Sequence, residues 1–393
     1  MSAGFWGFGR AGLPYRSSGA HERCPVSRLV PLMAPAKKLG GLLGCGNPVL
    51  GMTLTIGDGT LARSQLEGGS VVLAEEMHVP LFQQLSHDTQ TMYEAGGAAQ
   101  NTCRVCAWML GTVKKEVRPS CGYVGRAGDD ADGKRLAALA VDAGLRATYE
   151  IDADRPTGRL ATLVSRSDGA RTMVADLGAS THYDPGHLEE HIPARLLEEA
   201  TVIVTDGFFL THAGGVHAVE AVGAHCALCA SRGEAKVLCL NLGAPYVCAH
   251  FGEALNSVLP HVDLLIGNRR EMIELARQRR LDVGADPNIH ALCITFASLP
   301  KHSGARGRVV VATSGAGDTV VVENGLSKAF AVAPLNHQSI LDKNGAGDAF
   351  AGAFLAQLLL GRSVEDCVHA AHWAARVVIQ RSGMVLPEEC DYA

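Results

Sequence analysis

From Ser120 onwards, short apolar runs alternate with longer stretches of helical spacing, and this alternation restricts the fold more than any other feature of the chain. Four runs have the composition of buried strands and two stretches that of helices, at 121–124, 201–205, 237–242, 262–266, 130–143 and 212–231. Buried strands alternating with helices of about 10–15 residues predict a mostly parallel sheet covered by helices on both faces. The predicted fold class is therefore α/β, with ligands at the carboxyl ends of the strands.

The remaining stretches extend this pattern at both ends. Residues 40–50 are predicted to form a first buried strand that ends in a turn at Asn47-Pro48, and residues 51–95 a small subdomain of short strands and a helix inserted after it. Near the C-terminus, 308–313 and 319–322 predict a hairpin, and 349–360 and 364–380 predict two helices. The chain therefore has room for one large α/β domain and one small insertion.

Composition excludes several classes of protein. The chain has 393 residues and a net charge of −5, and because residues 1–40 carry six Lys or Arg and only Glu22, the rest carries −10. An acidic body argues against nucleic acid as a partner. No apolar run approaches the roughly 18 residues of a membrane span. We expect a protein that binds small molecules, with neither a nucleic-acid nor a membrane partner, and a monomer.

The cysteines and the N-terminus bear on the compartment. Twelve cysteines are scattered without a framework, including the pairs Cys103/Cys106 and Cys226/Cys229, and we interpret them as free thiols in a reducing environment rather than as a zinc site. Residues 1–39 are rich in Gly, Pro, Arg and Ser and predict a poorly ordered extension. The composition of residues 1–40 also permits an organelle-targeting peptide, but we expect a cytoplasmic protein.

The segment 342–354, DKNGAGDAFAGAF, carries the chemistry. Small residues at Gly345, Ala346 and Gly347 leave backbone N–H groups uncovered in front of a predicted helix, and a helix N-terminus favours phosphate or another anion. Asp348 stands at the mouth of this site, where a carboxylate is unfavourable unless it takes a proton. The alternative is a tight turn in which Asp348 only caps the helix.

A second Gly-Ala-Gly-Asp, at 315–318, joins two valine-rich runs and is predicted to be a hairpin turn without a helix behind it. Asp348 rather than Asp318 is therefore the candidate base. Another glycine turn, Gly96-Gly97, precedes a helix predicted from Thr102, with Asn101 in its first turn. A Walker phosphate loop and a dinucleotide-type GxGxxG after the first strand are both missing, so a chain that transfers phosphate must use another scaffold.

Taken together, these motifs resemble the PfkB (ribokinase-like) family of sugar and nucleoside kinases, and within it the branch that phosphorylates adenosine. The resemblance covers about 40–390 and rests on several segments in the right order, namely 342–354, 44–48, 96–101, 241–246, 268–271 and 377–383. It implies a three-layer αβα sandwich with a small β-sheet lid. The implied large domain is 40–50, 96–156 and 176–393, and the implied lid 51–95 and 157–175.

The resemblance also implies an activity and a set of site residues. The expected reaction is ATP-dependent phosphorylation of the 5′-hydroxyl of adenosine to give AMP, a step of purine salvage, with Asp348 as general base and Gly345, Ala346 and Gly347 as anion hole. Other residues are assigned by resemblance to the nucleoside (Asn47, Gly96, Gly97, Asn101 and Phe208 or Phe209), to ATP (Asn344, Arg171, Thr313 and His372) and, through water, to Mg²⁺ (Asn268 and Glu271).

Three positions depart from the family pattern. Gly51 stands where an aspartate normally accepts hydrogen bonds from the ribose hydroxyls, Lys343 replaces a threonine, and Ala98 stands where serine is common. A charge-assisted hydrogen bond is worth roughly 1.5–3 kcal/mol, so its loss should weaken nucleoside binding about ten- to a hundredfold. A Gly51→Asp substitution is then expected to lower the KM for adenosine, unless another carboxylate such as Asp58 compensates.

These departures leave two alternatives to adenosine phosphorylation. One is a PfkB-family kinase for another nucleoside or sugar, since the ribose contact has changed. The other is a weakly active paralogue that binds nucleoside for regulation. The intact set of Asp348, Gly345–Gly347, Asn268 and Glu271 argues against the second, because an inactive protein would not be expected to keep it.

Overall fold

The computed structural model describes residues 40–57, 59–281, 283–284, 287–303 and 306–392, and within these it has two β-sheets. The predicted N-terminal extension 1–39 and Asp58 lie outside the described residues. The large sheet has nine strands in the order β14-β13-β12-β11-β10-β9-β1-β5-β6. In chain order they are β1 (Gly41–Cys45), β5 (Cys121–Gly128), β6 (Arg146–Asp152), β9 (Ala200–Asp206), β10 (Val237–Asn241), β11 (Leu264–Asn268), β12 (Val309–Ser314), β13 (Gly317–Glu323) and β14 (Leu326–Phe330).

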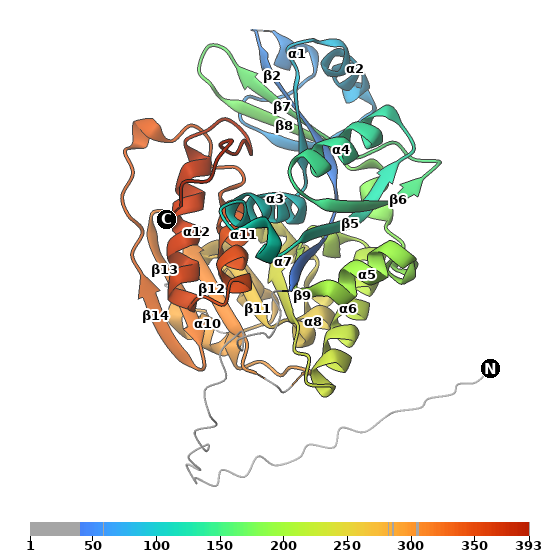
Figure 1. Ribbon diagram of the computed structural model, residues 1–393. Helices are drawn as coiled ribbons and strands as arrows, with labels where there is room; N and C mark the ends of the chain where they lie inside the picture. The colour runs from blue at the N-terminus through green and yellow to red at the C-terminus, as the bar shows by residue number, and fades with distance from the viewer. Residues whose placement is uncertain (1–39, 58, 282, 285–286, 304–305, 393) are drawn as a thin grey trace, which may run out of the picture.

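All pairs from β12 to β6 are parallel, and only β13 and β14 join antiparallel at one edge. Alternate residues of the strands face opposite sides, so Leu42 packs in one core cluster and Leu43 in the other. One face is covered by α3 (Ala98–Leu110), α4 (Ala131–Asp142), α11 (Ala346–Leu359) and α12 (Val364–Ile379). The result is the expected three-layer α/β sandwich (Figure 1).

Other helices cover the opposite face. They are α5 (His191–Glu199), α6 (Ala213–Ser231), α7 (Pro245–His250), α8 (Gly252–Val258), α9 (Arg269–Gln278) and α10 (Ile289–Ala297). Arg308 anchors this layer: its guanidinium is 1% exposed and donates to the carbonyl oxygens of Val262, Phe296, Leu299, Leu259 and Pro300. Helices that end beside β11 and β12 thus have their last carbonyl groups satisfied by one side chain.

The small sheet has five strands in the order β3-β8-β7-β2-β4 and lies beyond one end of the large sheet (Figure 1). Its strands are β2 (Val49–Ile56), β3 (Val71–Leu73), β4 (Met92–Gly96), β7 (Arg159–Ser165) and β8 (Arg171–Asp176), accompanied by α1 (Thr60–Arg63) and α2 (Val79–His87). The chain therefore crosses between the two sheets four times. The lid and domain boundaries inferred by resemblance remain predictions.

Several predicted boundaries were wrong by a few residues. The strand expected over 40–50 is β1 alone, because the chain turns at Gly46–Pro48 and Val49 already belongs to β2 in the other sheet. Helix α3 begins at Ala98 instead of Thr102, and α11 at Ala346 instead of Ala349. The 315–318 motif is the predicted hairpin turn between β12 and β13.

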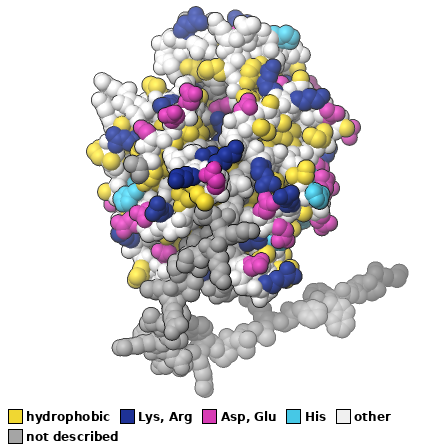
Figure 2. Space-filling model, viewed as in Figure 1, with side chains coloured by type: hydrophobic (Ala, Val, Ile, Leu, Met, Phe, Trp, Pro, Cys, Tyr) yellow, Lys and Arg dark blue, Asp and Glu magenta, His cyan; other side chains and the backbone are white. Residues whose placement is uncertain are grey.

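The described cysteines are free and almost all buried, as the scattered pattern predicted. Cys103 and Cys106 lie in α3, and Cys226 and Cys229 in α6. Within the described part of the chain, no three His, Cys, Asp or Glu side chains are grouped to hold a metal. None of the described helices combines the length and apolar character needed to cross a membrane. On the face seen in Figure 2, basic and acidic side chains are interspersed.

Candidate active site

Asp348 is held in the first turn of α11 by a residue far away in sequence. Asn101, in the first turn of α3, donates from Nδ2 to Asp348 Oδ2 at 3.0 Å. Arg104, one turn further along α3, donates from Nη1 to Asn101 Oδ1 at 3.1 Å and to the Ala95 carbonyl oxygen at 2.8 Å. The N-termini of α3 and α11 thus meet at the carboxylate of Asp348. The amide of Asn101 orients this carboxylate, and Arg104 in turn orients the amide.

The surroundings of Asp348 bring its pKa close to neutral pH. Burial raises its pKa to about 7, the Asn101 hydrogen bond opposes the rise, and the carboxylates of Asp206 and Glu271 add to it. A group that takes a proton at neutral pH works best with a pKa near the operating pH. A residue that only capped a helix would be expected to stay ionised, so the environment of Asp348 suits a general base.

The glycine turn in front of α11 has room for a ligand. Gly345 is the N-cap with φ +76°, a conformation that favours glycine, and a Cβ there would lie 2.6 Å from Met384 Sδ. Gly347 has nothing within 4 Å of where its Cβ would be. Gly345, Ala346 and Gly347 therefore stand at an accessible helix N-terminus, as an anion site requires, although the N–H of Ala346 already donates to the Lys343 carbonyl oxygen at 3.3 Å.

The turn before α3 is fixed by close backbone packing. Gly97 has φ +104°, and a Cβ would lie 2.3 Å from the Asn47 carbonyl oxygen; at Gly96 it would lie 3.1 Å from the Val49 carbonyl oxygen. Asn47 itself is 8% exposed, donates from Nδ2 to the Phe208 carbonyl oxygen at 3.0 Å, and pairs through Oδ1 with His212 Nε2 at 3.1 Å. Its side chain therefore holds two loops together, and it keeps a second N–H and a second acceptor lone pair for the predicted contact with the nucleoside.

The two candidate aromatic residues differ in exposure. Phe209 is fully buried and packs edge-on against Tyr183 and His212, which places it in the core. Phe208 is half-buried, with its ring centroid 6.1 Å from that of Tyr246. Of the pair, Phe208 is the residue that can flank a base.

Asn268 and Glu271 form a capping box at the start of α9. Asn268 donates from its backbone N–H to Glu271 Oε2 at 2.7 Å and from Nδ2 to Oε1 at 2.6 Å, and burial raises the pKa of Glu271 to about 7. Both carboxylate oxygens are thus engaged. Direct coordination of a metal would break this cap, whereas contact through water would not.

Arg171 crosses from the small sheet to the glycine segment. Its Nη1 lies 2.8 Å from Asp342 Oδ2, and its Nη2 donates to Ser382 Oγ. Asp342 also accepts from the backbone N–H groups of Asn344, at 2.9 Å, and Gly383, at 3.1 Å. Asn344 is exposed, with Nδ2 3.5 Å from Met173 Sδ of β8. Arg171 and Asn344, two of the four predicted ATP-binding residues, therefore lie where β8 of the small sheet meets the glycine segment.

Thr313 lies in β12 and His372 in α12. Thr313 is half-buried near the end of β12 and pairs in register with Asn268 of β11. His372 Nε2 is 2.8 Å from Thr319 Oγ1, and burial lowers its pKa. His372 is thus occupied within the layer between β13 and α12, as a structural histidine would be, and it has one ring nitrogen left for a ligand.

Sequence reasoning missed three residues of this region. Asp206, at the end of β9, is 2% exposed and accepts from the backbone N–H groups of Ala99, at 2.7 Å, and Phe209, at 3.0 Å. Arg104 positions Asn101, and Glu94 lies 3.9 Å from Arg104. An acid at the carboxyl end of a buried strand was a usable signal for Asp206. Nothing in the sequence around Glu94 and Arg104 indicated that these two residues belong to the site.

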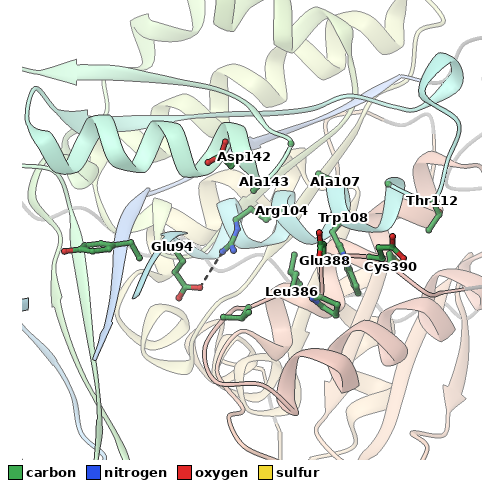
Figure 3. A pocket seen from close by; sticks show the side chains of 16 residues that line it. Glu94, Arg104, Ala107, Trp108, Thr112, Asp142, Ala143, Leu386, Glu388 and Cys390 are labelled. Atoms are coloured by element: carbon green, nitrogen blue, oxygen red, sulfur yellow. Dashed lines mark ion pairs between the residues drawn. The ribbon is translucent and has the colours of Figure 1, made fainter. Parts of the chain in front are cut away.

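A cavity of about 750 Å³ adjoins the site on the other side of Arg104. It lies between α3 and the C-terminal segment 385–390, and Figure 3 shows Glu94 and Arg104 facing each other at its edge. Trp108, which stacks on Trp373 at 5.4 Å, forms part of its wall.

Comparison with known proteins agrees with this geometry. Residues 70–390 match the family model described as pfkB family carbohydrate kinase. Two adenosine kinases of Arabidopsis thaliana, adenosine kinase 1 and adenosine kinase 2, are 35% and 34% identical to the chain, over 92% and 90% of its length and 100% and 97% of theirs.

Solved structures give the same picture. The Anopheles gambiae adenosine kinase in complex with P1,P4-di(adenosine-5) tetraphosphate superposes with a TM-score of 0.75 at 32% identity, covering 91% of this chain and 100% of that one. The apo adenosine kinase of Trypanosoma brucei brucei has a TM-score of 0.79 at 29% identity, covering 87% and 99%. The Schistosoma mansoni adenosine kinase, solved with adenosine and AMP, has a TM-score of 0.74 at 27% identity, covering 91% and 100%.

Proposed function

Because the chain belongs to the pfkB family of carbohydrate kinases, we propose that it is a kinase that transfers the γ-phosphoryl group of ATP to the 5′-hydroxyl of adenosine, giving AMP and ADP. The observation that carries the proposal is the placement of Asp348, with a pKa of about 7, in the first turn of α11. A base and an anion site on the same helix turn are what phosphoryl transfer to a hydroxyl needs.

The chemistry follows from this placement. Asp348 accepts the proton of the 5′-hydroxyl while the hydroxyl oxygen attacks the γ-phosphorus, and the bond from that phosphorus to the β–γ bridging oxygen breaks. The N–H groups at Gly345–Gly347 stabilise charge on the phosphoryl oxygens, and Asn101 keeps the carboxylate aimed at the hydroxyl. Phe208 would flank the adenine, and the turn at Gly96 and Gly97, which close backbone packing fixes, would contact the nucleoside.

ATP would bind where the two sheets meet. Arg171 and Asn344 are the residues placed to neutralise and hold its phosphates, with Thr313 and His372 towards the nucleotide base. Closure of the small sheet over them would exclude water, so that ATP is not simply hydrolysed.

Mg²⁺ fits the donor set through water. Glu271 and Asp206 both raise the pKa of Asp348, so three carboxylates act on one region, and a divalent cation would offset their repulsion. When bound, the metal would neutralise the phosphate oxygens of ATP. Asn268 and Glu271 would hold its waters while keeping their capping box.

The test is a panel of nucleosides and sugars with Mg-ATP. We expect adenosine to be converted to AMP, with one ADP formed per AMP. No AMP at millimolar adenosine, while another panel member is phosphorylated, would replace this proposal by the alternative of a different substrate, which Gly51 favours. Absence of turnover for every member, with nucleoside binding retained, would favour a regulatory paralogue. We further propose a cytoplasmic monomer that serves purine salvage.

A further inference from the structure

We propose that Glu94 supplies the carboxylate that binds the sugar hydroxyls of the nucleoside, in the place that Gly51 leaves open, so that this chain has its ribose-binding acid on β4 instead of β2. The inference rests on the proposed function, since it assigns one specificity contact of the same site. Nothing in the sequence alone connects the two positions.

The two residues are direct neighbours. Gly51 and Glu94 stand opposite each other in the antiparallel pair β2–β4, so their side chains share a face of the sheet. A Cβ added to Gly51 would lie 2.6 Å from Glu94 Cγ and 3.2 Å from Glu94 Oε1. The Glu94 side chain therefore occupies the space that a side chain of residue 51 would take.

One carboxylate oxygen of Glu94 lacks a donor. Its Oε2 is buried and has no hydrogen-bond partner among the described residues, and Arg104 Nη1 is 3.9 Å away. That nitrogen already donates to Ala95 and Asn101. Burial raises the pKa of Glu94, and the charge of Arg104 and a backbone hydrogen bond from Met384 counteract the rise. A buried acceptor without a donor is unfavourable, and hydroxyl groups of a bound sugar would supply the missing donors.

Glu94 is connected to the proposed base, Asp348, through a row of neighbouring side chains. Arg104 is close to Glu94 and donates to Asn101, which in turn donates to Asp348. The strand that carries Glu94 runs directly through Gly96 and Gly97 into α3. A nucleoside whose 5′-hydroxyl meets Asp348 would therefore have its ring hydroxyls further along this row, towards Glu94.

This geometry reverses the sequence-based expectation for Gly51→Asp. With Glu94 in place, the new side chain would collide with it, and two carboxylates would repel each other. Gly51→Asp alone should weaken adenosine binding. Combined with Glu94→Ala, which empties the space, the same substitution should restore it.

The experiment measures binding of adenosine, 2′-deoxyadenosine and 3′-deoxyadenosine by calorimetry without ATP, in the full chain. The wild type should bind adenosine about tenfold or more tightly than at least one deoxynucleoside. Glu94→Ala should lose about ten- to a hundredfold in adenosine affinity and bind that deoxynucleoside unchanged, and Glu94→Gln should lose less. Exposed Glu67, changed to Ala, is the matched control and should bind as the wild type.

Three results would overturn the inference. They are equal binding of the three nucleosides by the wild type, full adenosine affinity in Glu94→Ala, and failure of Gly51→Asp/Glu94→Ala to regain the affinity that Glu94→Ala loses. The first needs no variant, so it decides the matter even if the substitutions unfold the chain. If adenosine is still converted to AMP, only the role of Glu94 fails; if adenosine is neither bound nor converted, the proposed function fails with it.

Discussion

Arg171 of β8 and Asp342 of the glycine segment form an ion pair of 2.8 Å that joins the small sheet to the helix that carries Asp348. Both side chains are largely buried, at 10% and 3% exposure. Such a pair does two things at once. It holds the small sheet against the large one, and it keeps a guanidinium beside the anion site at the start of α11.

Arg171→Ala should therefore affect both stability and ATP binding. Asp342 would keep its two backbone donors but lose its cation, at a cost of about 1.5–3 kcal/mol in the free energy of unfolding, and the KM for ATP should rise about tenfold or more. Urea unfolding and initial rates measure the two effects. Arg166→Ala, an exposed arginine just after β7, is the control; equal behaviour of both variants would argue against the role of Arg171.

Asp348→Asn should abolish most turnover while leaving the nucleoside bound. A positioned general base contributes about 10²–10⁴-fold to the rate, and the amide keeps the size of the side chain. Single-turnover rates and adenosine affinity should separate the two effects. Asp318→Asn, in the exposed hairpin copy of the motif, should leave the rate unchanged. A normal rate for Asp348→Asn would remove it as the base.

The rate should depend on the protonation of Asp348. Because the base must be deprotonated and its pKa is raised to about 7, kcat/KM should fall as the pH drops below about 7. Asn101 lowers this pKa through its hydrogen bond, so Asn101→Ala should move the acid limb of the profile to higher pH. A pH–rate profile for both proteins checks this, and a limb that stays in place or moves to lower pH would contradict it.

The same carboxyl group should make stability depend on pH. Its pKa is raised in the folded state, so its stabilising contribution is complete below its ordinary value of 3.8 and is lost as the pH rises through about 7. An asparagine at position 348 does not titrate, so its contribution to stability does not change with pH. The Tm of Asp348→Asn should therefore exceed that of the wild type more at pH 8 than at pH 5, and thermal melts at the two pH values would show a constant difference if the group were ordinary.

Arg308→Met should unfold the protein far more easily without touching the site. The substitution removes a guanidinium that donates to five carbonyl oxygens, three of them on the buried residues Leu259, Val262 and Phe296, and losses of about 3–5 kcal/mol follow when a buried charged network is broken. Guanidinium unfolding measures it. Adenosine affinity of the protein that remains folded should match that of the wild type, and a change in affinity would point to a wider disturbance.

The sequence was informative where the signal was local. The alternation of strands and helices predicted the layered sheet, and the helix behind 345–347 separated that motif from the hairpin copy at 315–318. The predicted start of α11 was wrong because the small residues before Ala349 were assigned to the turn. Ala346, Gly347 and Asp348 are already helical, since Gly345 alone, with its positive φ, serves as the cap.

The rest of the site depends on contacts between distant segments. The facing of Gly51 and Glu94 is set by strand register, which the residues of either strand do not reveal by themselves. Asn47 and Phe209 carried plausible side chains for a ligand, yet one is used to join loops and the other fills the core. Such uses are decided by what packs around a residue.

The strand order also bears on synthesis of the chain. β1 is made early but lies between β5 and β9, so one of its edges stays unpaired until residues 200–206 have emerged from the ribosome. The hydrogen bond between Asn101 and Asp348 spans 247 residues. Long-range pairing of this kind is slow to form, and an incomplete chain exposes a strand edge. A nascent chain would thus gain the proposed base, Asp348, only after all strands of the large sheet have been made, and a truncated product that lacks α11 would be exposed to aggregation.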